Sequence, residues 1–364
     1  MTATPCSTFP QAGERLQGLD TLAARAARES QPLPSGGEIS RTMIWDFAAA
    51  VQDGNPAYWD ETWARGSRFQ HLVVPPTMLL THTRYPPGPA GTAAEWTPDY
   101  LREPRAPLAD LLSGIAKQGC DVWTNASREE WYHEALAPGD QVVTAVRVEL
   151  SEVKQTRLAR GVFVTTFARH LRSSDGAEVA RSKNVLFCYP SSDSTEVTPA
   201  PAAGDIPPDS GELGGDPPPD TRRDPFETLV ADEVAVGDRI PKLAWKVDFM
   251  DLMRAAQGTR HPVPLHTDRE FAQRAGSRDA YFSTLWQAGL IGRFVNDWAG
   301  PEAWLRHLRL TMMANICPGD TVTVQGSVVG RSEAGLADIS IMIFNDLGAV
   351  SQVSASVDLP CRSH

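Results

Sequence analysis

Two short stretches decide how this sequence is interpreted: DGNPAYWD, residues 53–60, and HPVPLHTD, residues 261–268. Each places proline between two polar or titratable side chains that lie five residues apart. These side chains are Asp53 and Tyr58 in the first stretch and His261 and His266 in the second. Proline favours turns, and side chains on either side of a turn can point at one centre. The repetition indicates two related copies of one unit.

A second repeated feature supports this duplication. Pro138-Gly139-Asp140 precedes QVVTAVRVEL, and Pro318-Gly319-Asp320 precedes TVTVQGSVVG. Pro-Gly and Gly-Asp mark turns, and the alternating apolar residues that follow are typical of strands. Each half therefore has the order helical segment, quoted stretch, Ala-rich helix, Pro-Gly-Asp turn and long strands. The repeat has a period of about 180 residues.

Further strands follow in both halves. Residues 162–190 predict a strand, a Ser-Asp-Gly turn and a second strand, and residues 337–360 predict the same around a turn at 345–348. Another strand entry stands at 236–239. Helices with a curled antiparallel sheet make this an α+β protein. Such a sheet alone exposes an apolar face and an edge, which a second half can cover. Two unrelated α+β domains are the alternative.

A polar segment separates the two halves. Residues 191–224 are rich in Pro, Gly, Asp and Ser and contain almost no large apolar residue. Such a segment cannot bury enough surface to offset the entropy of ordering it, which predicts a disordered linker. The predicted organisation is an N-terminal extension (1–37), a first domain (38–190), the linker (191–224) and a second domain (225–364). A docking role for the linker is the alternative.

Composition and charge exclude several classes of function. The 364 residues carry a net charge of −11 with neutral histidines, which disfavours nucleic-acid binding. We find no apolar run of the roughly 18 residues that a membrane span needs. The first ten residues lack the layout of a signal peptide. The five cysteines are widely spaced and indicate neither a zinc site nor a disulfide framework. These features predict a reduced, cytoplasmic protein.

The two quoted stretches resemble the Asp-x-Asn-Pro-x-His signature of the MaoC-like (R)-specific enoyl-CoA hydratases and dehydratases. The first keeps Asp53 and Asn55 but has Tyr58 in place of histidine. The second keeps His266 but has His261 in place of aspartate. The resemblance covers most of the chain, roughly residues 38–190 and 224–360. It implies a duplicated hot-dog fold, in which an antiparallel sheet wraps around a central helix in each half.

The resemblance also implies a chemistry. The family substrate is a trans-2-enoyl thioester of CoA or of an acyl-carrier protein, so no cofactor is expected beyond the CoA or phosphopantetheine of the substrate. An acid and a base act on one water molecule. Here His266 is the expected acid or base and His261 its altered partner. The thioester oxygen needs a backbone N–H at the start of the central helix, expected near Ser283, Thr284 and Leu285.

Several residues also have a structural interpretation. Asp53 and Asn55 lack a histidine partner and are expected to brace their turn. Asp268 either caps the following helix or orients His266. Trp286 lies in the core or lines the acyl pocket, for which Tyr58 is a second candidate. His261 and His266 do not have a usual zinc spacing, so no metal is expected.

Three functions remain open. The first is an enoyl-thioester hydratase or dehydratase with a His/His pair. The second is a non-catalytic thioester-binding subunit that pairs with an active hot-dog protein, because the change at His261 favours loss of activity. The third is a thioesterase or other thioester chemistry on the same fold. The expected assembly is a homodimer or a hot-dog heteromer.

Overall fold

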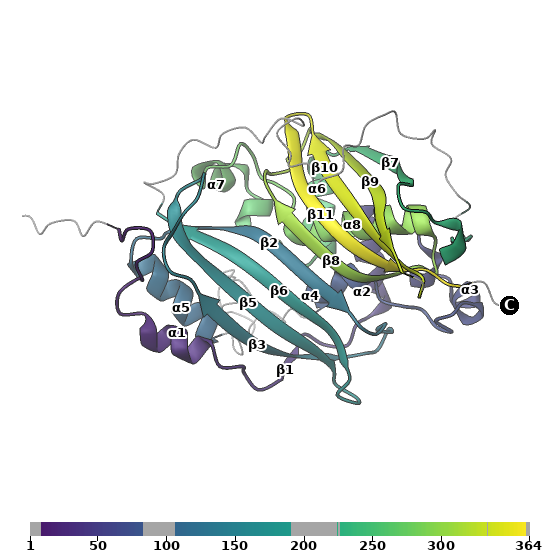
Figure 1. Cartoon of the computed structure of the whole chain (residues 1–364), viewed down its shortest axis with the longest axis horizontal. Helices are drawn as coiled ribbons and strands as arrows, with labels where there is room; N and C mark the ends of the chain where they lie inside the picture. The colour runs from purple at the N-terminus through teal and green to yellow at the C-terminus, as the bar shows by residue number, and fades with distance from the viewer. Residues whose placement is uncertain (1–8, 83–105, 191–223, 225, 333, 362–364) are drawn as a thin grey trace, which may run out of the picture.

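One antiparallel sheet forms the frame of the molecule. The computed structural model describes residues 9–82, 106–190, 224, 226–332 and 334–361 (Figure 1). The predicted linker, 191–224, lies outside the described residues except for Asp224. Within the described ranges, no helix is long and apolar enough to cross a membrane.

The first half contributes short helices followed by long strands. Its helices are α1 Asp20–Ala26, α2 Arg41–Val51, η1 Pro56–Tyr58, α3 Glu61–Gly66, η2 Pro76–Met78, α4 Leu79–His82 and α5 Ala106–Lys117. Its strands are β1 Leu33–Ser35, β2 Val122–Tyr132, β3 Val142–Leu150, β4 Lys154–Gln155, β5 Arg160–Arg172 and β6 Glu178–Tyr189. Both α1 and β1 fall within the predicted N-terminal extension, and β1 pairs with β3.

The second half repeats this order. Its helices are η7 Ala231–Glu233, α6 Phe249–Gly258, η8 Pro264–His266, α7 Arg269–Arg274 and α8 Thr284–Ala299. Its strands are β7 Arg239–Lys246, β8 Trp304–Met312, β9 Thr321–Arg331, β10 Leu336–Asn345 and β11 Gly348–Asp358. The strands predicted after both Pro-Gly-Asp turns, and the hairpins that follow them, are present. The prediction missed β2 and β8.

The two halves share a continuous sheet. The strand order is β1-β3-β5-β6-β2-β8-β11-β10-β9-β7, with β4 paired to β5. Strands β2 and β8 form the junction between the halves, where Glu129 lies opposite Arg309. The expected antiparallel hot-dog arrangement is therefore confirmed, with the two predicted sheets joined edge to edge. This junction covers one strand edge of each half.

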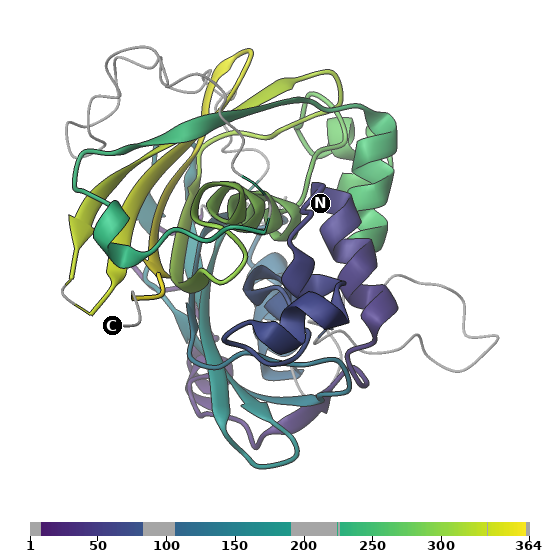
Figure 2. The same cartoon turned by 90° about the vertical axis from the view of Figure 1, so that its right-hand side faces the viewer.

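Helix α8 is the central helix of the second half. Ser283 caps its first turn by accepting a hydrogen bond from the backbone N–H of Trp286, and Gly300, with φ 89°, lies beyond its end. The sheet curves around this helix, which Figure 2 shows nearly end-on. Most of its side chains are buried, and they pack with β7 to β11 in a single apolar core.

Equivalent backbone hydrogen bonds support the internal duplication. In the first half, the N–H of Asp53 donates to Ala48 O, and in the second the N–H of His261 donates to Ala256 O, both at 2.8 Å. In both copies, the carbonyl oxygen of the residue before the last signature position also accepts a backbone hydrogen bond. Val73 N donates to Ala57 O at 2.9 Å, and Tyr281 N donates to Leu265 O at 3.2 Å. The two signature turns thus share one backbone conformation.

Candidate active site

The second signature copy places His266 beside the start of α8. Pro264 begins the single turn of η8, which ends at His266. The residue is 7% exposed, and its Nδ1 lies 2.7 Å from the carbonyl oxygen of Tyr281. Tyr281 precedes Ser283, the capping residue of α8, by two positions. The fold therefore brings the predicted base to the N-terminal end of the central helix.

This hydrogen bond fixes the form of the imidazole. A backbone carbonyl only accepts, so Nδ1 of His266 must carry the hydrogen that it donates. In the neutral ring, Nε2 is then the basic nitrogen. The ring also packs edge-on against the Tyr281 ring, with centroids 5.0 Å apart and planes at 89°. His266 is thus held in one orientation with a defined basic atom.

His261 lies next to His266. Their ring centroids are 5.0 Å apart and their planes meet at 60°. The backbone of His261 follows the end of α6, and its position is fixed by the hydrogen bond from its N–H to Ala256 O. The two predicted catalytic side chains therefore come together in space, as the turn between them requires.

The first turn of α8 offers backbone donors to a nearby oxyanion. Helix geometry leaves the first N–H groups without an acceptor inside the helix. The N–H of Trp286 donates to Ser283 Oγ at 3.2 Å, so the N–H groups of Thr284 and Leu285 are the candidate donors to an oxyanion. Leu285 is buried, whereas Thr284 is partly exposed. Thr284 is therefore the stronger candidate among the three predicted residues.

Two residues near this centre were not predicted. Burial raises the pKa of the Tyr281 phenol to about 12, so this group keeps its proton at neutral pH. Asn125, from β2 of the first half, donates from Nδ2 to Thr284 Oγ1 at 3.2 Å. The one signal in the sequence for Tyr281 is its place two residues before Ser283, where the central helix was predicted to start. Asn125 comes from a strand that the sequence pattern did not reveal.

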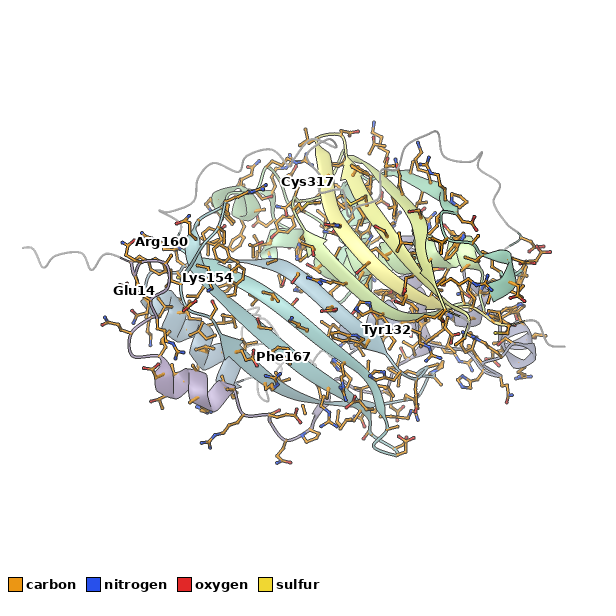
Figure 3. The ribbon with its side chains drawn as sticks, viewed as in Figure 1. Glu14, Tyr132, Lys154, Arg160, Phe167 and Cys317 are labelled. Atoms are coloured by element: carbon orange, nitrogen blue, oxygen red, sulfur yellow. The ribbon has the colours of Figure 1, made fainter. Side chains whose placement is uncertain are left out.

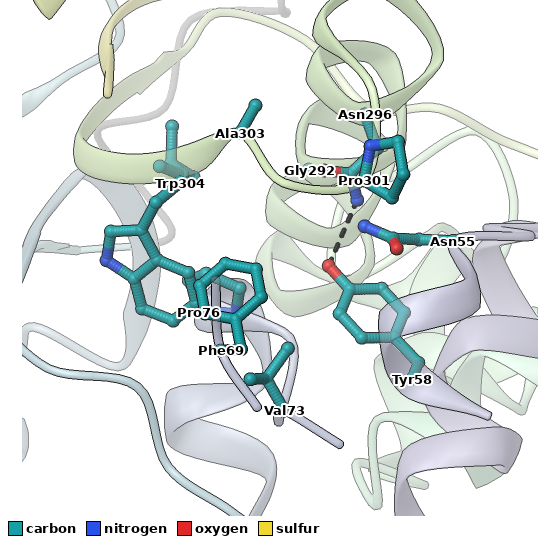
Figure 4. Close-up of a pocket in the computed structure, with 11 residues that line it drawn as sticks. Asn55, Tyr58, Phe69, Val73, Pro76, Gly292, Asn296, Pro301, Ala303 and Trp304 are labelled. Atoms are coloured by element: carbon teal, nitrogen blue, oxygen red, sulfur yellow. Dashed lines mark hydrogen bonds between the residues drawn. The ribbon is translucent and has the colours of Figure 1, made fainter. Parts of the chain in front are cut away.

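The first signature copy lies at the other end of α8. Asn296, in the last turn, donates from Nδ2 to Asp53 Oδ2 at 2.8 Å. It also donates to the Tyr58 hydroxyl at 3.0 Å, as Figure 4 shows. Asn55 Oδ1 accepts from the N–H of Ala57 at 2.9 Å and braces the turn, as predicted. Burial raises the pKa of Asp53 to about 6, and it raises that of Tyr58 well above its usual range.

A small cavity adjoins this first copy. Its lining includes Asn55, Tyr58, Asn296 and Trp304. Tyr58 therefore borders a cavity, but one about 20 Å along α8 from Ser283, at 1.5 Å per residue. The acyl-pocket role predicted for Tyr58 stays a prediction.

Helix α8 also caps the end of α2. The indole N–H of Trp286 donates to Ala50 O at 2.9 Å, and Arg293 Nη1 donates to Val51 O at 3.2 Å. Trp286 is fully buried and packs against Phe282, with ring centroids 4.2 Å apart. The structure thus places Trp286 in the core between the two halves. Its acyl-pocket role also stays a prediction.

Asp268 caps α7. Its Oδ1 accepts from the N–H of Phe271 at 2.9 Å, as the capping interpretation predicted. Among the residues that the structure describes, no group of three or more His, Cys, Asp or Glu side chains is arranged to hold a metal ion.

Comparisons with known proteins match this chain to enoyl-thioester enzymes. Residues 33–182 match the model of the FAS1-like, dehydratase domain region. The 3-oxo-4,17-pregnadiene-20-carboxyl-CoA hydratase beta subunit of Mycobacterium tuberculosis is 34% identical over 127 residues, which are 35% of this chain and 96% of that protein. The alpha subunit of the same hydratase is 32% identical over 143 residues, 38% of this chain and 42% of that subunit.

Solved structures match over nearly the whole chain. A MaoC-like dehydratase has a TM-score of 0.68 at 18% identity, covering 94% of this chain and 100% of that one. A putative MaoC domain protein dehydratase from Chloroflexus aurantiacus has a TM-score of 0.58 at 11% identity, covering 92% and 96%. These likenesses show the fold, and the match to almost the full length of the beta subunit shows the family. The chain belongs to the MaoC-like hot-dog hydratases and dehydratases.

Proposed function

We propose that this protein hydrates a trans-2-enoyl thioester, or runs the reverse dehydration, with His266 and His261 as its acid–base pair. The observation that carries the proposal is the fixed ring of His266. Its Nδ1–H is bound to Tyr281 O at 2.7 Å, its ring lies 5.0 Å from that of His261, and both stand beside the start of α8.

In the proposed reaction, His266 Nε2 takes a proton from water as the water oxygen bonds to Cβ of the substrate. The electrons of the double bond move toward Cα and the thioester oxygen. The N–H of Thr284 and the positive end of α8 stabilise the negative oxygen. Protonated His261 then delivers a proton to Cα. Transfer of the proton from His266 back to His261 restores the starting state.

The substrate and the assembly belong to the same proposal. The relatives named as subunits of a pregnadiene-carboxyl-CoA hydratase support a CoA thioester with a bulky acyl group. Their alpha and beta names support a heteromer with another hot-dog protein, and a homodimer is the alternative. No cofactor beyond the CoA of the substrate takes part in this scheme. The chain aligns with 42% of the alpha subunit.

The test is a panel of enoyl-CoA and 3-hydroxyacyl-CoA thioesters, with mass detection of hydrated, dehydrated and hydrolysed products. We expect hydration without free acid. Replacing His266 with alanine should lower kcat/KM by about 100-fold or more, the usual range for a general base. The matched control is His133→Ala, because the side chain of His133 is 42% exposed. Release of free acid would instead indicate a thioesterase.

A second variant tests the altered residue. His261→Asp restores the Asp/His pair of the family, and we expect it to retain or raise hydration of a trans-2-enoyl-CoA. If the wild type and this variant are both inert yet bind acyl-CoA, the non-catalytic subunit is the better account. Addition of the purified protein to an active hot-dog partner, with and without His266→Ala, then distinguishes a binding role.

A further inference from the structure

The inner face of the first half of the sheet carries a row of buried polar side chains. His170 on β5 is fully buried; its Nδ1 lies 3.2 Å from Thr144 Oγ1 on β3, and its Nε2 lies 3.0 Å from Ser182 Oγ on β6. Ser182 lies opposite Glu130 of β2 in the strand register. The row therefore crosses four neighbouring strands.

On β2 the row contains a buried ion pair. Glu130 is fully buried and accepts from Arg128 Nη2 on one oxygen and from the Tyr132 hydroxyl on the other, each at 2.5 Å. Figure 3 labels Tyr132 near the end of this strand. Glu130 thus neutralises the charge of Arg128. Among the described residues, Arg128 Nε has no hydrogen-bond partner, although the side chain is only 3% exposed.

The polar row also reaches the candidate active site. Asn184 on β6 lies opposite Arg128 and donates from Nδ2 to Asn125 Oδ1 at 3.1 Å. Asn125 in turn donates to Thr284 Oγ1 in the first turn of α8. Arg128 is three residues farther along β2, so it lies at most roughly 10 Å from Asn125 at 3.3 Å per residue.

The fold itself does not require an arginine, a glutamate and a histidine at these positions, because the second half has mostly apolar side chains at the equivalent ones. Across four strands of the first half, the residues that lie opposite one another are Thr144, His170, Ala180 and Tyr132. The equivalent residues of the second half are Val324, Ile343, Ser351 and Met312. Arg128 and Glu130 correspond to Leu308 and Leu310, which are buried around α8. Burying an ion pair where leucines suffice gives no gain in stability.

The row also divides the core. On one side lies an apolar cluster that includes Leu111 of α5 and Val164, and on the other a cluster that includes Phe47 of α2 and Val142. The second half has one continuous core instead. A polar strip between two apolar regions suits an elongated apolar molecule with an oxygen part-way along its length.

We propose that Arg128 Nε–H binds a neutral oxygen, a keto or hydroxyl group, on the acyl part of the thioester substrate. Because Glu130 already balances the guanidinium charge, a neutral acceptor fits better than a second carboxylate. The oxygen would lie on the order of 10 Å from the thioester, according to the spacing along β2. This inference rests on the proposed function, since it concerns the substrate handled at His266.

The first experiment measures binding alone. Two unreactive saturated acyl-CoA thioesters of equal length, one with a keto group on the order of 10 Å from the thioester, are titrated into the purified protein by calorimetry. We expect the keto compound to bind about tenfold more tightly, as one hydrogen bond from a charged donor allows. Equal affinities would overturn the proposal and leave the row as a structural feature of the core.

The second experiment removes the Arg128 donor together with its charge partner Glu130. Arg128→Leu/Glu130→Leu copies the leucines of the second half and leaves no unpaired buried charge. We expect it to fold, to keep its affinity for the plain compound and to lose the preference for the keto compound. The matched control, Arg147→Leu, removes an arginine that covers Phe167 at 3.9 Å on the opposite face, and it should keep the preference.

The two proposals fail separately. If no thioester is hydrated but the keto preference depends on Arg128, the binding site stands and the proposed reaction does not. If hydration depends on His266 but the double variant retains the preference, the assignment of Arg128 is wrong.

Discussion

The two signature copies share one pattern of backbone hydrogen bonds but lie at opposite ends of α8. The second copy lies at the N-terminal end of α8, where His266 and His261 stand 5.0 Å apart. The first lies at the C-terminal end, where Asn296 binds both Asp53 and Tyr58. The positive end of a helix dipole stabilises an oxyanion, and the negative end does not. One copy is therefore suited to chemistry and the other to holding the two halves together.

The largest stability effect should come from the contact between α2 and α8. Replacing Trp286 with alanine removes a fully buried ring and its hydrogen bond to Ala50 O. We expect a loss of about 3–5 kcal/mol in the free energy of unfolding, measured by chemical denaturation. Trp286→Phe keeps most of the packing and should lose less. A loss below about 1 kcal/mol for the alanine variant would contradict a core role.

Asp53 should make the stability depend on pH. Its pKa rises from 3.8 to about 6 in the folded state, mainly through burial, so the folded protein holds the proton more tightly than the unfolded chain. This contribution is present at low pH and is lost as the pH rises from about 4 through about 6. The wild type should therefore lose about 1–3 kcal/mol relative to Asp53→Asn over that range. A constant difference between the two proteins would contradict this.

Tyr58 should contribute least. Tyr58→Phe keeps the buried ring and removes only the hydroxyl that accepts from Asn296, which still has Asp53 as a partner. We expect a loss of about 1 kcal/mol by denaturation. A larger loss, of 3 kcal/mol or more, would indicate that the hydroxyl supports more of the interface than this one hydrogen bond.

The repeated motifs were enough to predict the duplication and both hairpins after the Pro-Gly-Asp turns, and the family resemblance predicted the hot-dog fold and the start of α8. The strands at the junction were missed for physical reasons. Strand β2 places Arg128 and Glu130 on its buried face, which removes the alternation of apolar residues. Strand β8 pairs with β11 through a register shift at Ser356 and Val357, which interrupts a simple period of two.

The site was predictable only in part. His261 and His266 were found because the signature places them in one turn. Asn125 and Asn296 act through contacts between segments far apart in the chain, Tyr281 contacts His266 across 15 residues, and no local pattern marks any of the three. The different roles of the two copies depend on which end of α8 each copy contacts. These contacts form only in the folded protein, so the sequence alone does not predict them.

The most direct test compares the two copies in one assay. The values of kcat/KM for hydration of a trans-2-enoyl-CoA are measured for His266→Ala and for Tyr58→Phe beside the wild type. We predict a loss of about 100-fold or more for His266→Ala and a change within about threefold for Tyr58→Phe. An equal loss in both variants, or a larger loss in Tyr58→Phe, would contradict the assignment of the chemistry to the second copy.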